Sequence, residues 1–141
     1  MKLNDAAREF IGAGADATLV TLNPDGSPQV SLVWVALQST PDGDELVTAH
    51  LAEHKKVRNV RRDPRVAVTI ADTGPLRDTM RPYLSITGTA RIVEGGAPEL
   101  LKELAQTLSP PNVPFPPKDA PAGWLTRIRI DKVGGFGPWV S

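Results

Sequence analysis

The fold is decided by residues 18–37, TLVTLNPDGSPQVSLVWVAL, where two apolar segments flank a single turn. Both segments are rich in β-branched residues, which favour extended strands. Between them, Pro24-Asp25-Gly26-Ser27 supplies turn residues, and Gly26 can adopt the positive φ that a tight hairpin requires. The stretch therefore predicts two antiparallel strands, over 18–23 and 28–37, joined by a hairpin.

Further strands follow the same pattern along the chain. A second turn of the same type, over 41–44, leads into a strand at 45–52. Gly88, inside a later apolar segment, predicts a bulge or a close approach of another backbone. The remaining segments with strand composition are 65–72, 83–94 and 124–133. Six strands predict one mainly β domain with helices (α+β), a closed or half-closed barrel that spans residues 1–141.

Two segments outside the strands have helical spacing. Apolar residues recur at every third or fourth position over 3–11, and Gly12 and Gly14 are expected to end that helix. The segment 97–108 is typical of an amphipathic helix packed on a sheet. Its apolar positions are Leu100, Leu101, Leu104, Ala105 and Leu108.

Composition excludes several classes of protein. The 16 basic and 16 acidic side chains and a pI of about 6.7 argue against a nucleic-acid binder, which usually carries a basic surplus. The absence of cysteine excludes disulfides, thiolate metal sites and a cysteine nucleophile, and fits a reducing compartment. Charged residues interrupt the N-terminal segment where a signal peptide would be apolar, and no run reaches membrane-spanning length. We therefore expect a cytoplasmic protein with no membrane partner.

The segment 54–65, HKKVRNVRRDPR, carries six basic residues against one acid. In a helix over 53–62, Val57 and Val60 can face the sheet. That arrangement leaves Lys55, Lys56, Arg58, Asn59 and Arg62 around the exposed sides. Cations in a first helical turn are unfavourable unless an anion is brought to them. The segment is therefore either a solvated basic helix or a site for the phosphate or carboxylate of a small molecule.

A Pro-rich segment at 109–121, SPPNVPFPPKDAP, has six prolines that enforce irregular, extended backbone. One interpretation is a stiff connector that runs back across the barrel. The other is a lid beside a ligand pocket.

The sequence resembles, in three consecutive blocks, the split-barrel superfamily that contains pyridoxamine 5′-phosphate oxidase and the flavin or deazaflavin oxidoreductases. The blocks are TLNPDGSPQVSLVWV (21–35), LVTAHLAEHKKVRNVRRDPRVAVTI (46–70) and YLSITGTARIVE (83–94). It is particularly similar to the small members that use coenzyme F420, and the resemblance runs from Thr18 to Val133. It implies a six-stranded antiparallel split β-barrel of the FMN-binding type, a homodimer, and a cofactor groove at the subunit interface.

The resemblance also implies which residues contact the cofactor. The basic helix would bind its phosphate and carboxylates through Lys55, Lys56, Arg58 and Asn59. The end of the preceding strand would lie along the cofactor chain at Thr48, Ala49 and His50, and Tyr83 matches an aromatic position of the family.

On the strand over 28–37, the face expected to meet the cofactor ring carries Gln29, Ser31 and Val33. Trp34, on the opposite face, is expected to pack in the core or at the dimer contact. Gln29 and Ser31 have an alternative interpretation as ordinary edge-strand polar residues, and Tyr83 as a half-buried barrel residue.

The chemistry implied is redox, with the cofactor carrying the reaction. No catalytic side chain and no metal site is expected, because His50 and His54 have no third ligand or nucleophile near them in sequence. A reduced deazaflavin would deliver hydride to a planar, conjugated small molecule. Coenzyme F420 is favoured over FMN, because its long anionic tail needs a spread of cations and the helix offers five. A carrier or sensor that binds flavin or deazaflavin without turnover remains the alternative.

The C-terminal segment 132–141, KVGGFGPWVS, contains three glycines that are expected to let the backbone turn freely after the last strand. Phe136 and Trp139 would then cap their own barrel or, alternatively, cross to the dimer partner and help to wall the cofactor groove.

Overall fold

The computed structural model describes residues 1–76 and 79–140. Its elements are, in order, α1 (Asp5–Ile11), β1 (Ala15–Leu22), β2 (Pro28–Thr40), β3 (Gly43–His50), α2 (Lys55–Arg62), β4 (Arg65–Ala71), β5 (Tyr83–Glu94), α3 (Ala97–Leu108) and β6 (Trp124–Phe136).

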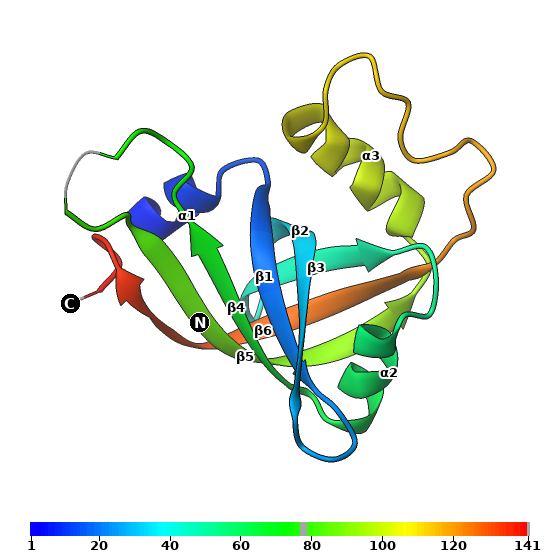
Figure 1. Ribbon diagram of the computed structural model, residues 1–141, viewed down its shortest axis with the longest axis horizontal. Helices are drawn as coiled ribbons and strands as arrows, with labels where there is room; N and C mark the ends of the chain where they lie inside the picture. The colour runs from blue at the N-terminus through cyan, green and yellow to red at the C-terminus, as the bar shows by residue number, and fades with distance from the viewer. Residues whose placement is uncertain (77–78, 141) are drawn as a thin grey trace.

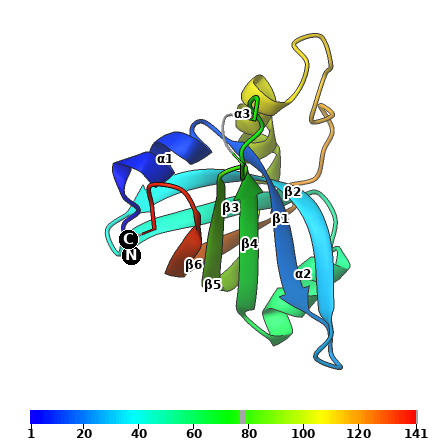
Figure 2. The same ribbon diagram turned by 60° about the vertical axis from the view of Figure 1, so that its left-hand side comes forward.

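The six strands close into a barrel in the order β1-β2-β3-β6-β5-β4, and each neighbouring pair is antiparallel. Figure 1 shows α1 on the left of the barrel and α2 and α3 on the right. Figure 2 shows α1 near one end of the strands and α2 near the other. The mainly β fold with a six-stranded antiparallel barrel, predicted from the sequence, is confirmed.

The hairpin between β1 and β2 forms as its sequence predicts. Gly26 has a φ of 86°, and the Asn23 N–H donates to the Ser27 carbonyl at 2.8 Å. The Asp25 carboxylate accepts from the Ser27 N–H at 3.0 Å, which is the local bonding expected of an aspartate in a turn.

The main core fills the barrel and continues under α1. Alternate residues of the strands point inward, so that each strand contributes apolar side chains at every second position. Among the most deeply buried are Leu19, Val35, Leu46, Val68, Leu84, Ile86, Ile128 and Ile130. From α1, Ala7 and Ile11 join this cluster, and Asn4 caps the helix by accepting from the Ala7 N–H.

A second cluster lies on the outside of the barrel beneath α3. Leu100 and Leu104 of α3 pack against Ala36, Val47 and Leu125 of three strands. The amphipathic pattern predicted for 97–108 is thus confirmed, and it fixes α3 on the outer face of β2 and β3. Within the described residues, no helix is long and apolar enough to cross a membrane.

The register between β5 and β6 shifts at Thr87/Gly88. A Cβ at Gly88 would overlap the Arg129 carbonyl oxygen and would lie 2.7 Å from Ile128 Cγ2. Gly88 therefore permits a close backbone approach at a bulge, as its position in a strand predicts.

The last strand is longer than its sequence predicts. Gly134, Gly135 and Phe136 do not form a hinge after residue 133, because they pair with Ser85, Leu84 and Tyr83 of β5. Two glycines weaken the local preference for a strand. Pairing with the neighbouring strand β5 nevertheless holds these residues in the sheet.

The tail packs on its own chain. The Trp139 ring lies 4.6 Å from the Phe10 ring of α1, centroid to centroid, and its Nε1 donates to the Tyr83 carbonyl at 3.2 Å. Trp139 thus caps its own barrel, the first of the two alternatives considered. The other alternative, in which the tail crosses to a dimer partner and helps to wall the cofactor groove, stays a prediction.

Candidate functional site

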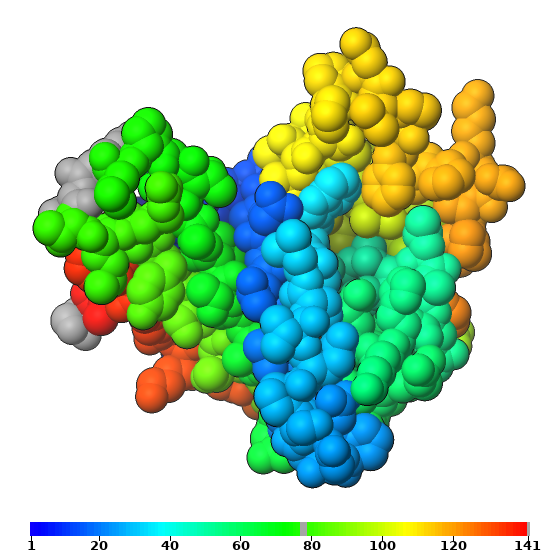
Figure 3. All heavy atoms as spheres, viewed as in Figure 1, coloured from blue at the N-terminus to red at the C-terminus, as the bar shows by residue number. Residues whose placement is uncertain are grey.

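A pocket of about 350 Å³ lies between the barrel wall, α2 and α3. Figure 3 shows a hollow between β2 (light blue), the segment of α2 (blue-green) and the α3 region (yellow to orange). Its lining comes from β1, β2, the end of β3 and the loop after it, α2, α3 and the Pro-rich segment. The residues are Asp16, Leu32, Val33, Trp34, Thr48, Ala49, His50, Leu51, His54, Lys56, Leu101 and Phe115.

Five of the residues proposed from the sequence line this pocket together: Val33, Thr48, Ala49, His50 and Lys56. They meet here because β3 ends at His50 and α2 begins five residues later, so the chain turns around the pocket. Lys55 and Arg58 lie exposed on the same short helix. These two flank the pocket rather than line it.

The six cations of the basic segment divide into two groups. Arg61 forms an ion pair with Glu53, Arg65 pairs with Asp63 at 2.7 Å, and Arg62 donates to the Leu22 carbonyl. Within residues 1–76 and 79–140, the other three have no ion pair with a carboxylate: Lys55, Lys56 and Arg58. Arg58, like Arg62, donates to a backbone carbonyl, that of Glu53 at 2.8 Å, and a carbonyl leaves the charge of the guanidinium without a counter-ion. Lys55, Lys56 and Arg58 are the three of these cations closest to the start of the helix, where an anion would bind.

The start of α2 favours an anion as well. His54 occupies the N-cap without a side-chain hydrogen bond to the helix, and no acid lies in the first turn. The Val57 and Arg58 N–H groups bond to the His54 carbonyl. The preceding N–H groups of the first turn, with the positive end of the helix dipole, are placed to meet negative charge.

Burial acts on the ionisable groups of the pocket. It lowers the pKa of the Lys56 ammonium below its usual value, since a charge loses hydration there. Burial, and then the positive charges of Lys56 and Arg58, lower the pKa of His54. An anion bound beside Lys56 and His54 would favour the charged forms of both groups, so this side of the pocket is suited to negative charge.

His50 plays a structural part at the base of the pocket. It is 3% exposed, and its Nε2 lies 2.7 Å from Thr126 Oγ1 on the adjacent strand β6. Burial, followed by the charges of Lys56 and His54, lowers the pKa of His50 to about 3, so the imidazole is neutral near pH 7. The His50 and His54 rings lie 6.5 Å apart, and the described residues contain no group of three His, Cys, Asp or Glu placed to hold a metal.

Asn59 is not on the exposed side of the helix, and that expectation was wrong. The residue is 1% exposed, and its Nδ2 donates at 3.1 Å to Thr21 Oγ1 and at 3.1 Å to Asn23 Oδ1. Its amide group thus ties α2 to the end of β1. Val57 and Val60, predicted to face the sheet, are buried as expected.

Three other proposed residues lie outside the pocket. Gln29 and Ser31 are half-buried, and Gln29 Oε1 accepts from Thr21 Oγ1 and from Ser31 Oγ, both at 3.4 Å. Tyr83 begins β5 and pairs with Phe136, beside the tail and α1. A single chain therefore does not bring these three side chains to the pocket.

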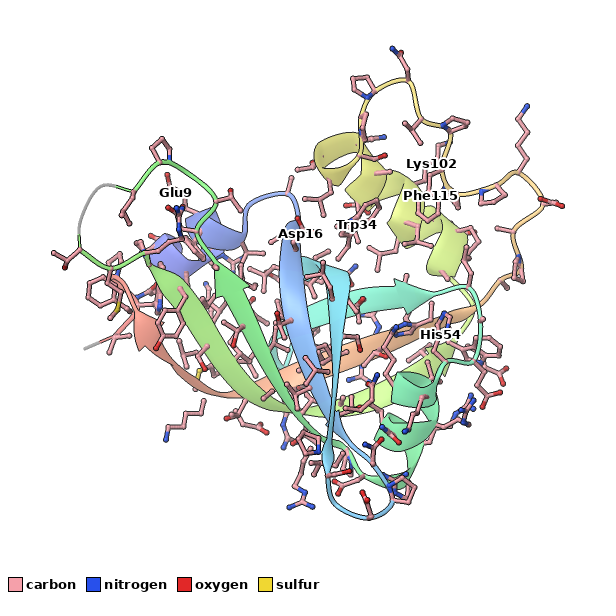
Figure 4. The ribbon with its side chains drawn as sticks, viewed as in Figure 1. Glu9, Asp16, Trp34, His54, Lys102 and Phe115 are labelled. Carbon is pink, nitrogen blue, oxygen red and sulfur yellow. The ribbon has the colours of Figure 1, made fainter. Side chains whose placement is uncertain are left out.

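The structure adds residues that the sequence did not single out for the site. Trp34, expected in the core or at a dimer contact, lines the pocket. Its ring packs edge to face against Phe115 of the Pro-rich segment, with the two ring centroids 5.7 Å apart. Figure 4 shows this aromatic pair on the α3 side of the pocket and His54 on the α2 side. Phe115 lies in an irregular segment without any periodicity, so its aromatic character among prolines was the only available signal.

Comparison with solved structures shows a shared fold. A structure named F420 reductase is 23% identical, with a TM-score of 0.73 over 90% of this chain and 94% of that one. An FMN-binding protein from Syntrophomonas wolfei subsp. wolfei is 17% identical, with a TM-score of 0.66 over 94% and 85% of the two chains. The heme storage protein HutZ from Vibrio cholerae is 17% identical, with a TM-score of 0.60 over 96% and 95%.

Identities at this level establish the common architecture and leave the ligand open, because the three relatives differ in what their names say they bind or act with. Comparison with curated proteins found no match. The family model of pyridoxamine 5′-phosphate oxidase, however, matches residues 3–133, nearly the whole barrel with its helices. The chain therefore belongs to the pyridoxamine 5′-phosphate oxidase family.

Proposed function

We propose that the chain binds coenzyme F420 at the pocket between α2 and α3 and acts as an F420-dependent oxidoreductase. One observation carries the proposal: among the described residues, Lys55, Lys56 and Arg58 have no carboxylate partner, and Lys56 lines the pocket with a pKa lowered by burial. A ligand phosphate at α2 would supply the missing charge through charge-assisted hydrogen bonds. The bound cofactor would supply the hydride, and a planar, conjugated small molecule would accept it.

The residues of the pocket have separate roles in this proposal. Lys56 and the first turn of α2 hold the phosphate, while Lys55 and Arg58 attract the remaining anionic groups of the tail from the exposed side. Neutral His50 contributes a wall without a competing charge, because its proton is disfavoured near pH 7. Val33 and Ala49 exclude water from the cofactor chain, which strengthens the polar contacts beside them.

FMN is a second candidate cofactor, and the structure supports it in one respect. The choice of F420 depended on five cations for a long anionic tail, and three of the five, Arg58, Arg61 and Arg62, bond to groups of their own chain. A smaller number of available cations suits one short phosphate as well as a longer tail. The similar fold of an FMN-binding protein is compatible with this alternative.

Cofactor titration tests the proposal directly. The purified protein is titrated by calorimetry with F420 and FMN, each paired with a control that has the same ring and no phosphate: the deazaflavin core and riboflavin. We expect F420 to bind most tightly and each phosphate-free control to bind at least tenfold more weakly, the loss that about 1.4 kcal/mol produces. Binding of neither cofactor, or equal binding of riboflavin and FMN, would contradict the phosphate site.

Turnover separates an enzyme from a carrier or sensor. Reduced F420 is mixed with the protein and with planar acceptors such as quinones or nitroaromatics, and its oxidation is followed by absorbance. An enzyme accelerates oxidation only when both protein and acceptor are present. Tight binding without acceleration for any acceptor would favour the carrier.

We also propose a homodimer. The outer face of β2 exposes Val30 by 60% and Leu32 by 73%, and large apolar side chains grouped on one strand often mark a contact surface. A second copy seated on β2 would bring its own residues toward the pocket, since Leu32 belongs to both the exposed face and the pocket lining.

A further inference from the structure

The α3 side of the pocket differs in chemistry from the α2 side. His54 and Lys56 give the α2 side its positive charge, whereas Trp34, Phe115 and Leu101 make the α3 side aromatic and apolar. Asp16 of β1 also lines the pocket, directly opposite Trp34 in the β1–β2 register. The pocket thus combines a cationic region that suits phosphate with an aromatic region that carries a carboxylate.

Phe115 reaches the pocket from a strap, residues 109–123, that joins α3 to β6. The strap is anchored at its ends, where the Ser109 N–H bonds to the Ala105 carbonyl and the Ala97 N–H bonds to the Ala122 carbonyl. Its middle is mostly exposed, and Phe115 alone among the strap residues lines the pocket. The edge-to-face contact with Trp34 is therefore where the middle of the strap meets the site.

Phe115 remains 37% exposed, and Trp34 is half-buried. Aromatic faces that are only partly covered favour stacking with another ring, because stacked and edge-to-face pairs add to simple burial of area. The Asp16 carboxylate is exposed and has no hydrogen bond or ion pair within residues 1–76 and 79–140. It is free to bind a cation or an N–H group on a ring held by the aromatic pair.

We propose that Trp34, Phe115 and Asp16 form a substrate subsite for a planar aromatic ring that carries a cationic or N–H donor group. The inference rests on the proposed function, in which this ring is the hydride acceptor beside the cofactor. Phe115 is the specificity-determining residue. The strap that carries it is tethered at both ends and therefore fixes how much space a ring has beside Trp34. Asp16 selects positive or donor-bearing rings over anionic rings of the same shape.

A matched pair of probes tests the subsite on the full chain. The two probes share one planar tricyclic ring system: 9-aminoacridine is a cation, and acridine-9-carboxylate is an anion. Binding is measured by fluorescence anisotropy of each probe. We expect the aminoacridine to bind more tightly than the carboxylate. Phe115→Ala should lower the affinity for aminoacridine roughly tenfold, and Phe115→Trp should retain that affinity. Asp16→Asn should lower the affinity for the cationic probe and leave the affinity for the anionic probe unchanged or higher.

Phe136→Ala is the control variant, because Phe136 is an exposed aromatic at the tail and does not line this pocket. It should bind both probes as the unmodified chain does. Wild-type affinity for aminoacridine in both Phe115→Ala and Asp16→Asn overturns the subsite. So does a preference for the anionic probe.

Cofactor titration of the same variants separates this inference from the proposed function. Phe115→Ala should lower aminoacridine affinity by a larger factor than cofactor affinity, and equal losses would overturn a separate subsite. If the unmodified chain bound neither F420 nor FMN, the proposed function would fail, while a Phe115- and Asp16-dependent aminoacridine site would still stand.

Discussion

The Asn59 side-chain amide donates to Thr21 Oγ1 at 3.1 Å, and this hydrogen bond joins α2 to β1 inside the protein. Both residues are at most 1% exposed, so neither group can exchange this partner for water. The position of the basic helix at the pocket therefore depends on a buried polar contact.

Asn59→Ala should lower the free energy of unfolding by about 1–3 kcal/mol, because it leaves the buried Thr21 hydroxyl of β1 without its donor. Arg58→Ala, one residue earlier on the exposed side, is the matched control and should cost within about 0.5 kcal/mol. Urea denaturation of the two variants measures both values. Equal stabilities for the two variants would show that the buried amide does not hold α2.

Lys56→Ala and Arg58→Ala should each weaken cofactor binding by about 1.5–3 kcal/mol, which is roughly a ten- to hundredfold loss of affinity. The reason is that neither cation has a carboxylate partner in the part of the chain that the structure describes, so a bound phosphate would be its main counter-charge. Arg65→Ala is the control, because Asp63 already pairs with that guanidinium. Calorimetric titration should show unchanged affinity for the control. Unchanged affinity in all three variants would contradict the phosphate site and favour the interpretation of the segment as a solvated basic helix.

Local patterns were enough to predict most of the fold. The hairpin around Gly26 depends on turn residues and alternating strands, and the face of α3 depends on spacing within twelve residues. Such signals lie within one element and require no knowledge of its neighbours. The length of β6 was different, because Gly134 and Gly135 join the sheet through pairing with β5, a partner distant in the sequence.

The site was harder to predict for the same reason. A polar residue on a basic helix is expected to be exposed. Asn59 is buried because its side chain bonds to Thr21 and Asn23, which come from another part of the sequence. Phe115 likewise reaches Trp34 through the path of an irregular segment. Thr48, Ala49, His50 and Lys56 line one pocket because the chain runs directly from the end of β3 into α2, and their role in cofactor binding stays a prediction.

The stability of the protein should fall as the pH drops below about 6.5, and His50 should cause part of that fall. Its folded pKa of about 3 lies below the unfolded value of 6.5, so between these values the unfolded chain binds a proton that the folded chain does not. Stability is then complete above about pH 6.5 and is lost progressively toward pH 3. For one group, the loss between pH 7 and pH 5 is about 2 kcal/mol.

His50→Gln should remove that contribution while keeping a polar group opposite Thr126. Urea denaturation at pH 7 and pH 5 measures the difference for the unmodified chain and the variant. His54→Gln, at the exposed cap of α2, is the control and should keep most of the pH dependence. An identical difference in all three proteins would exclude His50 as the source.

Gly88→Ala should destabilise the barrel by about 1–3 kcal/mol, because the new Cβ would overlap the Arg129 carbonyl oxygen at the β5–β6 bulge. Gly134→Ala is a matched control in the partner strand: its Cβ would meet no atom within 4 Å. Thermal unfolding should show a clear decrease in Tm for the first variant and almost none for the second. Similar melting temperatures would mean that the bulge can shift to accept a side chain.

Val30→Asp should weaken a homodimer that forms through β2. Val30 is 60% exposed on the outer face of that strand and does not line the pocket, so the substitution should leave the fold of the single chain unchanged. A charge buried at an apolar contact loses hydration without gaining a partner, which disfavours association. Val113→Asp, an exposed apolar residue on the strap, is the control. Light scattering at micromolar concentration should report a dimer for the unmodified chain and the control, and a shift toward monomer for Val30→Asp. A monomer in all three proteins would contradict the homodimer. A dimer in all three would show that the contact does not depend on this face of β2.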